Sequence, residues 1–124
     1  MVKLIIDYAN KNSLNLYINE KDNDGYYPLL LSVYNDNYDI VELIIDYSDN
    51  KSLPLNINEK NNDGWSPLLW SIYNNNFDIF KLIIDYSTKK KIILNVNEKN
   101  IKGWYPLFLM IYNNNPEMIK MLLE

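Results

Sequence analysis

The chain has 124 residues, a formal net charge of −4, and neither cysteine nor histidine. The missing cysteine excludes disulfides, thiolate metal sites and a cysteine nucleophile, and the missing histidine removes the commonest general base. Every basic residue is lysine in an acidic chain, which argues against nucleic acid as a partner because phosphate binding needs clustered positive charge.

The chain begins with a predicted amphipathic helix. Met1, Leu4, Ile5 and Tyr8 follow the i, i+3, i+4, i+7 spacing of one apolar helical face. The same stripe recurs at 40–47, at 79–86 and from 118 onward. We therefore expect the chain to start in one second helix and to stop inside another, as part of a longer array would. The first apolar run is too short for a secretory core or a membrane span, and no targeting signal is visible, so the expected location is cytoplasmic.

Loops and short extended segments are predicted after these helices. Polar loops are expected at 9–13, 48–52 and 87–91, and alternating apolar runs follow at 14–18, 53–57 and 92–96. Alternation predicts an extended segment with one covered face. Because Pro54 cannot donate a hydrogen bond to a central ladder, we expect edge or coil-like strands. Asn-Asp-Gly at 23–25 and 62–64 then predicts a tight turn, since glycine adopts positive φ without steric cost.

A short helix is predicted to begin at each of three prolines. Pro28, Pro67 and Pro106 suit the first helical position, where φ is preset and the missing N–H would be unpaired anyway. Ser66 is a suitable N-cap, whereas the tyrosines at the other two positions cannot accept the N–H bonds in the same way. Asparagine-rich junctions at 35–37, 74–76 and 113–115 predict a helix end followed by a new N-cap.

These elements repeat with a period of 39 residues. Gly25, Gly64 and Gly103 keep that spacing, and a fixed period of roughly 20–50 residues is typical of a stacked repeat array. We predict a single repeat domain over residues 1–124. It comprises a partial repeat at 1–18, repeats at about 19–57 and 58–96, and a truncated one at 97–124.

The unit resembles the ankyrin repeat. The family pattern D-x-x-G-x-T-P-L-H, followed by a helix of the kind L-x-x-V-x-x-L-L, appears as DNDGYYPLL at 22–30 and DIVELII at 39–45. The resemblance implies an all-α repeat solenoid of stacked helix-turn-helix pairs with β-turn or hairpin loops. The family's Thr and His are replaced here by Tyr, Ser, Tyr and by Leu, Leu, Phe. The repeat also exceeds the usual ~33 residues, and the extra residues are expected in the loop after the second helix.

The resemblance also implies a non-catalytic protein–protein interaction module that binds its partner through a concave face. That face would be formed by the turn tips and the outward positions of the first helices. Carried over by position, the candidate partner-binding residues are Tyr26, Trp65, Trp104, Tyr34, Tyr73, Tyr112, Lys21, Lys60 and Lys99. Tyr and Trp dominate binding hot spots because they bury a large area with few rotatable bonds. The alternative is that these rings cover neighbouring repeats, and Trp70, at the position of Leu109, is expected in the core.

Catalysis has little support in the sequence. Ser32, Ser66 and Ser71 have no histidine to activate them, and no glycine-rich phosphate cradle is present. We expect no enzyme activity, cofactor, metal site or membrane partner. Two other functions stay open beside protein recognition. One is glycan or small-ligand binding by the ladder of Tyr26, Trp65 and Trp104, and the other is a structural spacer that self-associates end to end.

Overall fold

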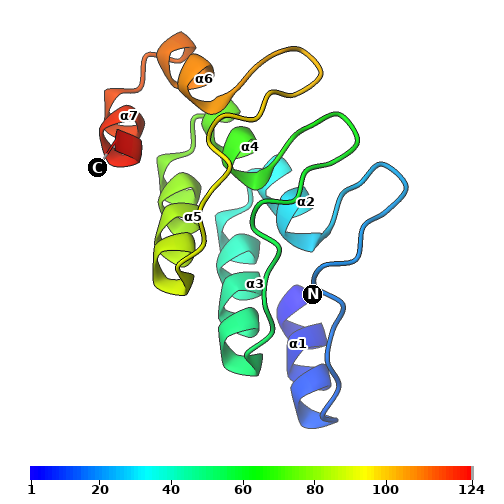
Figure 1. Cartoon of the computed structure of the whole chain (residues 1–124). Coiled ribbons are helices and arrows are strands. Elements are labelled where there is room, and N and C mark those ends of the chain that lie inside the picture. The colour runs from blue at the N-terminus through cyan, green and yellow to red at the C-terminus, as the bar shows by residue number, and fades with distance from the viewer. Residues whose placement is uncertain (124) are drawn as a thin grey trace.

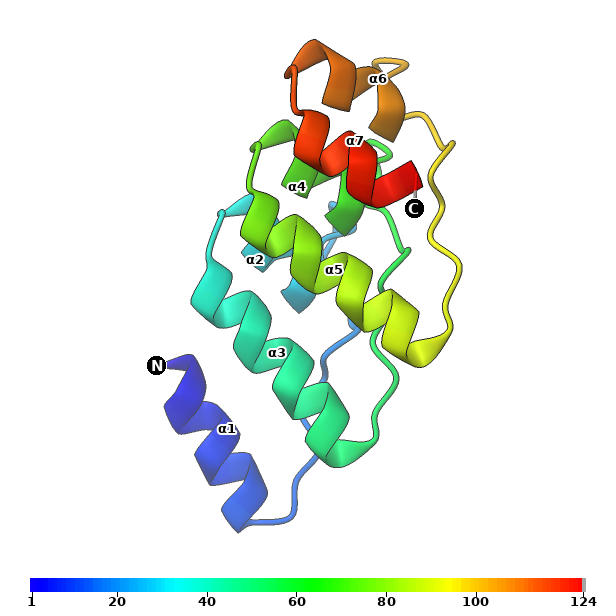
Figure 2. The same ribbon diagram turned by 90° about the vertical axis from the view of Figure 1, so that its left-hand side faces the viewer.

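The computed structural model describes residues 1–123, which form seven helices and no strand. The helices are α1 (Val2–Lys11), α2 (Pro28–Tyr34), α3 (Tyr38–Lys51), α4 (Pro67–Tyr73), α5 (Phe77–Lys90), α6 (Pro106–Tyr112) and α7 (Pro116–Leu123). The short helices α2, α4 and α6 stack in one row, and α1, α3, α5 and α7 stack in a second row beside it (Figures 1 and 2). Loops project to one side before each short helix (Figure 1). The predicted all-α repeat solenoid is confirmed.

The helix starts follow the predicted capping chemistry. The side chains of Asn37, Asn76 and Asn115 accept hydrogen bonds from backbone N–H groups three residues on, at 3.2, 3.0 and 3.0 Å, which satisfies donors that a helix N-terminus leaves unpaired. Ser66 caps α4 in the same way, at 3.2 Å from the Leu69 nitrogen. Tyr27 makes no such cap. Its hydroxyl instead donates to the Glu59 carbonyl of the next repeat at 2.8 Å.

The second helices are longer than predicted, so the expected loops at 9–13, 48–52 and 87–91 are largely wrong. The helix α3 continues to Lys51 and α5 to Lys90, and each ends where the next residue takes a positive φ, 52° and 57°. Ser48 and Ser87 are buried, and Ser87 Oγ donates to the Ile84 carbonyl of its own helix at 2.8 Å. A buried serine whose hydroxyl is satisfied inside the helix does not interrupt it. Part of the extra repeat length therefore lies in the helix.

The predicted extended runs keep their alternating burial but form no strand within residues 1–123. Leu55 and Ile57 are buried, while Pro54 before them and Asn56 between them are exposed. The backbone N–H of Leu55 donates to the Tyr86 hydroxyl at 3.2 Å, and the equivalent bond from Leu16 to the Tyr47 hydroxyl measures 2.9 Å. Side-chain acceptors thus replace a neighbouring strand, which is why the segment is coil.

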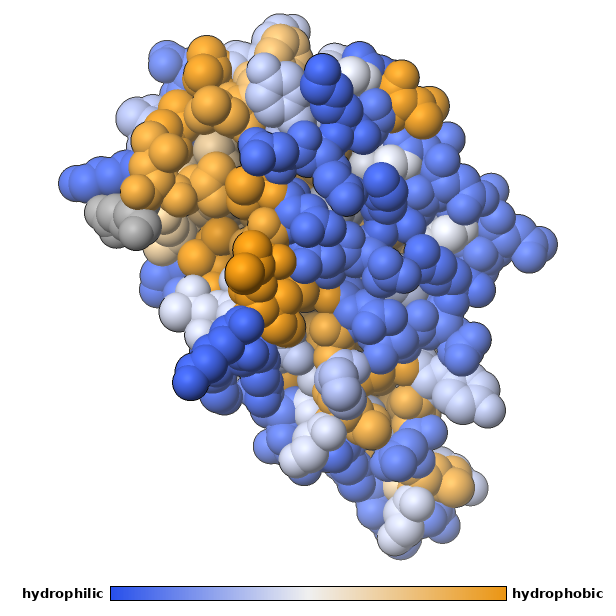
Figure 3. Space-filling view, viewed as in Figure 1, coloured by the Kyte–Doolittle hydropathy of each residue, from blue (hydrophilic) through white to orange (hydrophobic). Residues whose placement is uncertain are grey.

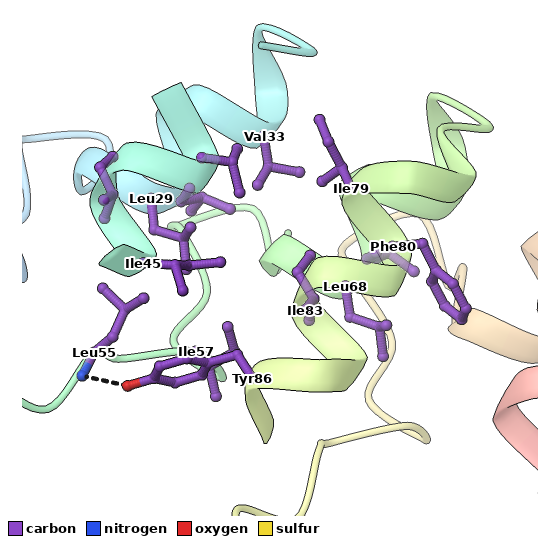
Figure 4. Close-up of a cluster of buried hydrophobic side chains, with 14 of the residues drawn as sticks. Leu29, Val33, Ile45, Leu55, Ile57, Leu68, Ile79, Phe80, Ile83 and Tyr86 are labelled. Carbon is purple, nitrogen blue, oxygen red and sulfur yellow. Dashed lines mark hydrogen bonds between the residues drawn. The ribbon is translucent and has the colours of Figure 1, made fainter. Parts of the chain in front are cut away.

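One continuous core runs between the two rows of helices. Figure 4 shows side chains from successive repeats in contact, including Leu29 and Val33 of α2, Leu68 of α4, and Ile79, Phe80 and Ile83 of α5. These six side chains are at most 2% exposed. No repeat could bury its own apolar face alone, so the stacking of neighbours makes the core.

Polar contacts also join neighbouring repeats. Asn76 Nδ2 donates to Asp36 Oδ1 at 2.7 Å, and Asn115 Nδ2 donates to Asn75 Oδ1 at the same distance. At the loop tips, the Asn62 nitrogen donates to the Asp24 carbonyl at 3.0 Å. The repeats are therefore held in register at the helix junctions and at the tips of the loops.

Candidate functional site: an aromatic face

One hydrogen-bond pattern, repeated at each loop tip, holds the aromatic residue that follows the loop-tip glycine. The backbone N–H groups of Tyr26, Trp65 and Trp104 each donate to the side-chain oxygen of the residue four positions earlier, at 2.8, 2.9 and 3.0 Å. Those acceptors are Asp22, Asn61 and Asn100. A carboxylate or amide oxygen that accepts from its own turn stabilises the tip. This positioning role was not predicted from the sequence, although the spacing of the residues was visible there.

The rings of successive repeats form one connected network. Tyr26 contacts Tyr34 with centroids 5.5 Å apart, Tyr34 contacts Trp70 at 4.8 Å, and Trp70 stacks on Trp65 at 3.8 Å. Trp65 then meets Trp104 edge to face at 5.9 Å. At the α6 end, Phe108 and Tyr112 stack on each other at 6.2 Å and line one cavity with Tyr73 and Trp104. We call the network and this pair together the aromatic face. It consists of Tyr26, Tyr34, Trp65, Trp70, Tyr73, Trp104, Phe108 and Tyr112. All six aromatic candidates from the sequence belong to it.

The exposed fraction of these rings differs between the tyrosines of the short helices and the tryptophan at the second loop tip. Tyr34, Tyr73 and Tyr112 are 46%, 47% and 77% exposed, so each offers a ring to the solvent. Trp65 is only 7% exposed and belongs to the core cluster. The indole of Trp65 therefore packs beneath the other rings and offers little surface to a partner.

Trp70 is an aromatic residue whose place on this face was not predicted from the sequence. It was expected in the core, and it does pack against core residues, yet it is partly exposed and lies between Tyr34 and Trp65. The available signal was a ring at a position where the other repeats carry Leu31 and Leu109. A residue that differs in type from its equivalents in the other repeats indicates that the surface differs locally at that position.

Two of the three predicted lysines join neighbouring repeats, whereas Lys99 Nζ lies 5.8 Å from the ring centroid of Tyr105 in its own repeat. Lys21 Nζ lies 3.5 Å from a Glu59 carboxylate oxygen, and Lys60 Nζ lies 3.1 Å from one of Glu98. These are exposed pairs, which typically contribute about 0–1 kcal/mol each. The cation on the aromatic face is instead Lys102, whose Nζ lies 4.7 Å from the Trp104 ring centroid.

A cavity of about 200 Å³ opens at the α6 end of the aromatic face. Its lining residues are Tyr73, Trp104, Phe108, Leu109, Tyr112 and Asn113. A second, more apolar cavity of about 280 Å³ lies at the opposite end, between α1 and the pair α2 and α3. In Figure 3, apolar surface gathers near α6 and α7, while the side with the loops is hydrophilic.

The chemistry of the face is stacking, apolar burial and hydrogen bonding by tyrosine hydroxyls. Burial raises the pKa of the Tyr26 hydroxyl above its ordinary value. Within residues 1–123, no group of three or more Asp or Glu side chains could hold a metal ion. No described helix combines the length and apolar character needed to cross a membrane.

Comparison with known families agrees with this architecture. A family model described as ankyrin repeats (3 copies) matches residues 1–93, and a model described as ankyrin repeat matches residues 102–124. No curated protein matches the chain. The repeated turn, short helix and second helix, together with the family matches over most of the sequence, show that the chain belongs to the ankyrin repeat family.

Proposed function

We propose that the chain is a non-catalytic module that binds a protein partner through its aromatic face. Ankyrin repeats are generally protein–protein interaction modules. The observation that carries the proposal is the exposure of Tyr34 and Tyr73, which belong to the connected network of rings, and of Tyr112, which stacks on Phe108 at the α6 end. Rings needed only for packing between repeats would be covered, as Trp65 is.

The network also suits binding energetically. Tyr73 touches Trp65, Trp70 and Trp104, with centroids 5.3, 5.5 and 5.9 Å away. A ring already held by its neighbours loses little rotamer freedom when a partner covers it, so more of the contact energy appears as affinity. Tyrosine adds a hydroxyl that can pair with polar groups of a peptide or protein surface.

The glycan alternative is less well supported by the geometry. Stacking on a sugar needs an open ring face, and Trp65 in the predicted ladder is 7% exposed. The planes of Trp65 and Trp104 also stand at 87° to each other. These two rings do not form a flat platform.

Affinity capture from a lysate of the source cell tests the proposal. We compare the wild-type chain with Tyr34→Ala/Tyr73→Ala and with a matched control, Tyr8→Ala/Tyr17→Ala. The control tyrosines are 64% and 81% exposed and take no part in the aromatic face. Removing two hot-spot rings should lower capture of a specific protein by at least about tenfold, while the control captures it like the wild type.

Circular dichroism establishes that all three chains are folded. If the two double variants capture the same protein equally well, the aromatic face is not the binding surface and the proposal is wrong. Release of the captured material by free sugar would favour the glycan function instead. A molecular mass that rises with concentration, measured by sedimentation, would favour end-to-end self-association.

A further inference from the structure

The aromatic face differs between its second and third repeats at two neighbouring positions. One is Leu69 in α4 and Phe108 in α6, and the other is the position that follows it. In α4 that position is Trp70, whose ring is surrounded by Tyr34, Trp65 and Tyr73 with centroids 4.8, 3.8 and 5.5 Å away. In α6, 39 residues later, the position is Leu109. Leucine is shorter and has no planar ring, so it cannot occupy the volume that the indole fills.

The α6 cavity lies where the missing indole would be. Tyr73, Trp104 and Tyr112, which line it, are the 39-residue equivalents of the three rings that surround Trp70. Leu109 lines it as well. The same three-ring arrangement thus occurs twice in the molecule. In α4 it encloses the Trp70 side chain, and in α6 it borders a cavity of about 200 Å³.

The chemistry of the lining favours a neutral ring over a charged or polar group. Four of the six lining residues are aromatic, and the single polar one, Asn113, uses its amide nitrogen in a 2.7 Å bond to the Ile72 carbonyl. Trp70 itself has a buried indole nitrogen without a hydrogen-bond partner in the described residues, so stacking is what holds that ring. A cation on Trp104 would be repelled by Lys102, whose Nζ is already 4.7 Å from the ring centroid.

We propose that the α6 cavity accepts a neutral planar side chain of the partner, a Trp, Tyr or Phe residue, which stacks on Trp104 as Trp70 stacks on Trp65. The inference rests on the proposed function, because it assigns this partner residue to the same aromatic face. Trp70 is the internal template, and it makes indole the best-fitting ring.

Entry of the ring requires one side-chain movement. The centroids of Tyr73 and Trp104 are 5.9 Å apart and their planes are nearly parallel. A ring inserted between them at the Trp65–Trp70 spacing would need about twice 3.8 Å. Tyr73 is 47% exposed, so its side chain has room to turn outward while Trp104 keeps its place at the loop tip. The ring contacts that Tyr73 then gives up are a cost of binding, which the new stack on Trp104 must exceed. Binding should therefore change the signals of both rings.

Titration with N-acetyl-tryptophanamide, followed by NMR, tests the proposal. The chain has three tryptophans, so its indole N–H signals are resolved and assigned by single Trp→Phe variants. We expect saturable shifts at Trp104, with a dissociation constant on the order of 1 mM for so small a probe. N-acetyl-leucinamide and tetramethylammonium should bind at least several-fold more weakly.

The decisive variant is Leu109→Trp, which places in α6 the ring that α4 already has. It should fill the cavity, raise the melting temperature and weaken probe binding at Trp104 by at least about tenfold. The matched control is Leu31→Trp, at the same repeat position in α2 and 45% exposed. This control should leave probe binding at Trp104 unchanged.

Three results would overturn the inference. They are no shift at Trp104 at saturating probe concentrations, probe binding that survives in a folded Leu109→Trp chain, and tetramethylammonium or leucinamide binding as tightly as the indole. If Leu109→Trp fails to fold, Tyr112→Ala replaces it, since that side chain is 77% exposed and its loss should still weaken binding several-fold. If the chain does not bind the probe but still captures a partner through Tyr34 and Tyr73, only the pocket is rejected. Probe binding without such capture would reject the proposed function.

Discussion

At the scale of single residues, small differences between equivalent positions decide the local surface. The Trp70 and Leu109 pair is one case. The loop-tip glycines are another, because all three have positive φ, between 78° and 89°, yet their surroundings differ. A Cβ atom on Gly64 would lie 2.7 Å from the Asn100 Cα, whereas one on Gly103 would meet nothing within 4 Å. The cost of a side chain therefore depends on the repeat.

Gly64→Ala should destabilise the protein more than Gly103→Ala. Both substitutions force a non-glycine residue to positive φ, which costs about 1–2 kcal/mol, and Gly64→Ala adds a clash with backbone of the next repeat worth about 1–3 kcal/mol more. Urea denaturation of both variants measures the difference in free energy of unfolding. Equal values would mean that the loop tips shift freely and do not hold neighbouring repeats in register.

At the scale of elements, the second helices determine the course of the loops that follow. The Tyr47 and Tyr86 hydroxyls accept backbone N–H bonds from loop residues in the preceding repeat. Both tyrosines are at most 4% exposed. The loop between helices is thus attached to the next second helix by a side chain, and the attachment repeats along the array.

Tyr86→Phe removes one such attachment without changing the shape of the side chain. The buried Leu55 N–H then lacks its acceptor, which should lower the free energy of unfolding by about 1–3 kcal/mol. Tyr8 occupies the same repeat position in α1 but is 64% exposed, so Tyr8→Phe should change stability by less than about 0.5 kcal/mol. Chemical denaturation checks both, and equal effects would show that the hydroxyl bond to Leu55 contributes nothing.

At the scale of the whole molecule, coupling between neighbouring repeats includes one compact ionic cluster. Asp49 at the end of α3 lies 2.9 Å from Lys90 Nζ and 3.1 Å from Lys89 Nζ at the end of α5. Hydrogen bonding from Lys90, followed by that from Lys89, holds the pKa of Asp49 below its ordinary value of 3.8. The charged form is therefore favoured by folding.

Asp49→Asn should remove a pH-dependent part of the stability. Because the folded pKa is lowered, the contribution is present above about pH 4 and is lost as the pH falls through the folded pKa. We expect wild type to exceed the variant by up to about 1 kcal/mol at neutral pH and low salt, and the gap to close in acid or high salt. Thermal unfolding between pH 2 and 7 measures this.

The control is Asp46→Asn, on the same helix and without an ion pair in the described part of the chain. A gap between wild type and Asp49→Asn that stays constant with pH would contradict the ionic origin of the contribution.

The two ends of the array show how much burial of a side chain depends on a neighbouring repeat. Leu29 and Leu68 are 0% and 2% exposed, whereas Leu107, at the same repeat position in α6, is 39% exposed. At the other end Leu31 is 45% exposed and its equivalent Leu109 is 3% exposed. The burial of a given position is therefore a property of the stack and not of the residue type.

The sequence by itself determined the repeat period, the order of the helices, their proline and asparagine starts, and the family. These follow from local chemistry, since an N-cap, a proline at a helix start and a glycine turn act within a few residues. The length of the second helices was not predicted, because the burial of Ser48 and Ser87 against neighbouring repeats overrides their polarity. The missing strands have a similar reason, since tyrosine hydroxyls from the next repeat take up the loop donors.

The candidate site was likewise predicted in part from the sequence and decided in part by the tertiary structure. Its aromatic columns could be chosen from the sequence because they recur every 39 residues. Only the tertiary structure decided that Trp65 is covered, that Trp70 belongs to the face and that a cavity opens beside Trp104. Each of these depends on which rings of adjacent repeats meet across the stack, and contacts between residues so distant in sequence are determined by packing and not by local sequence pattern.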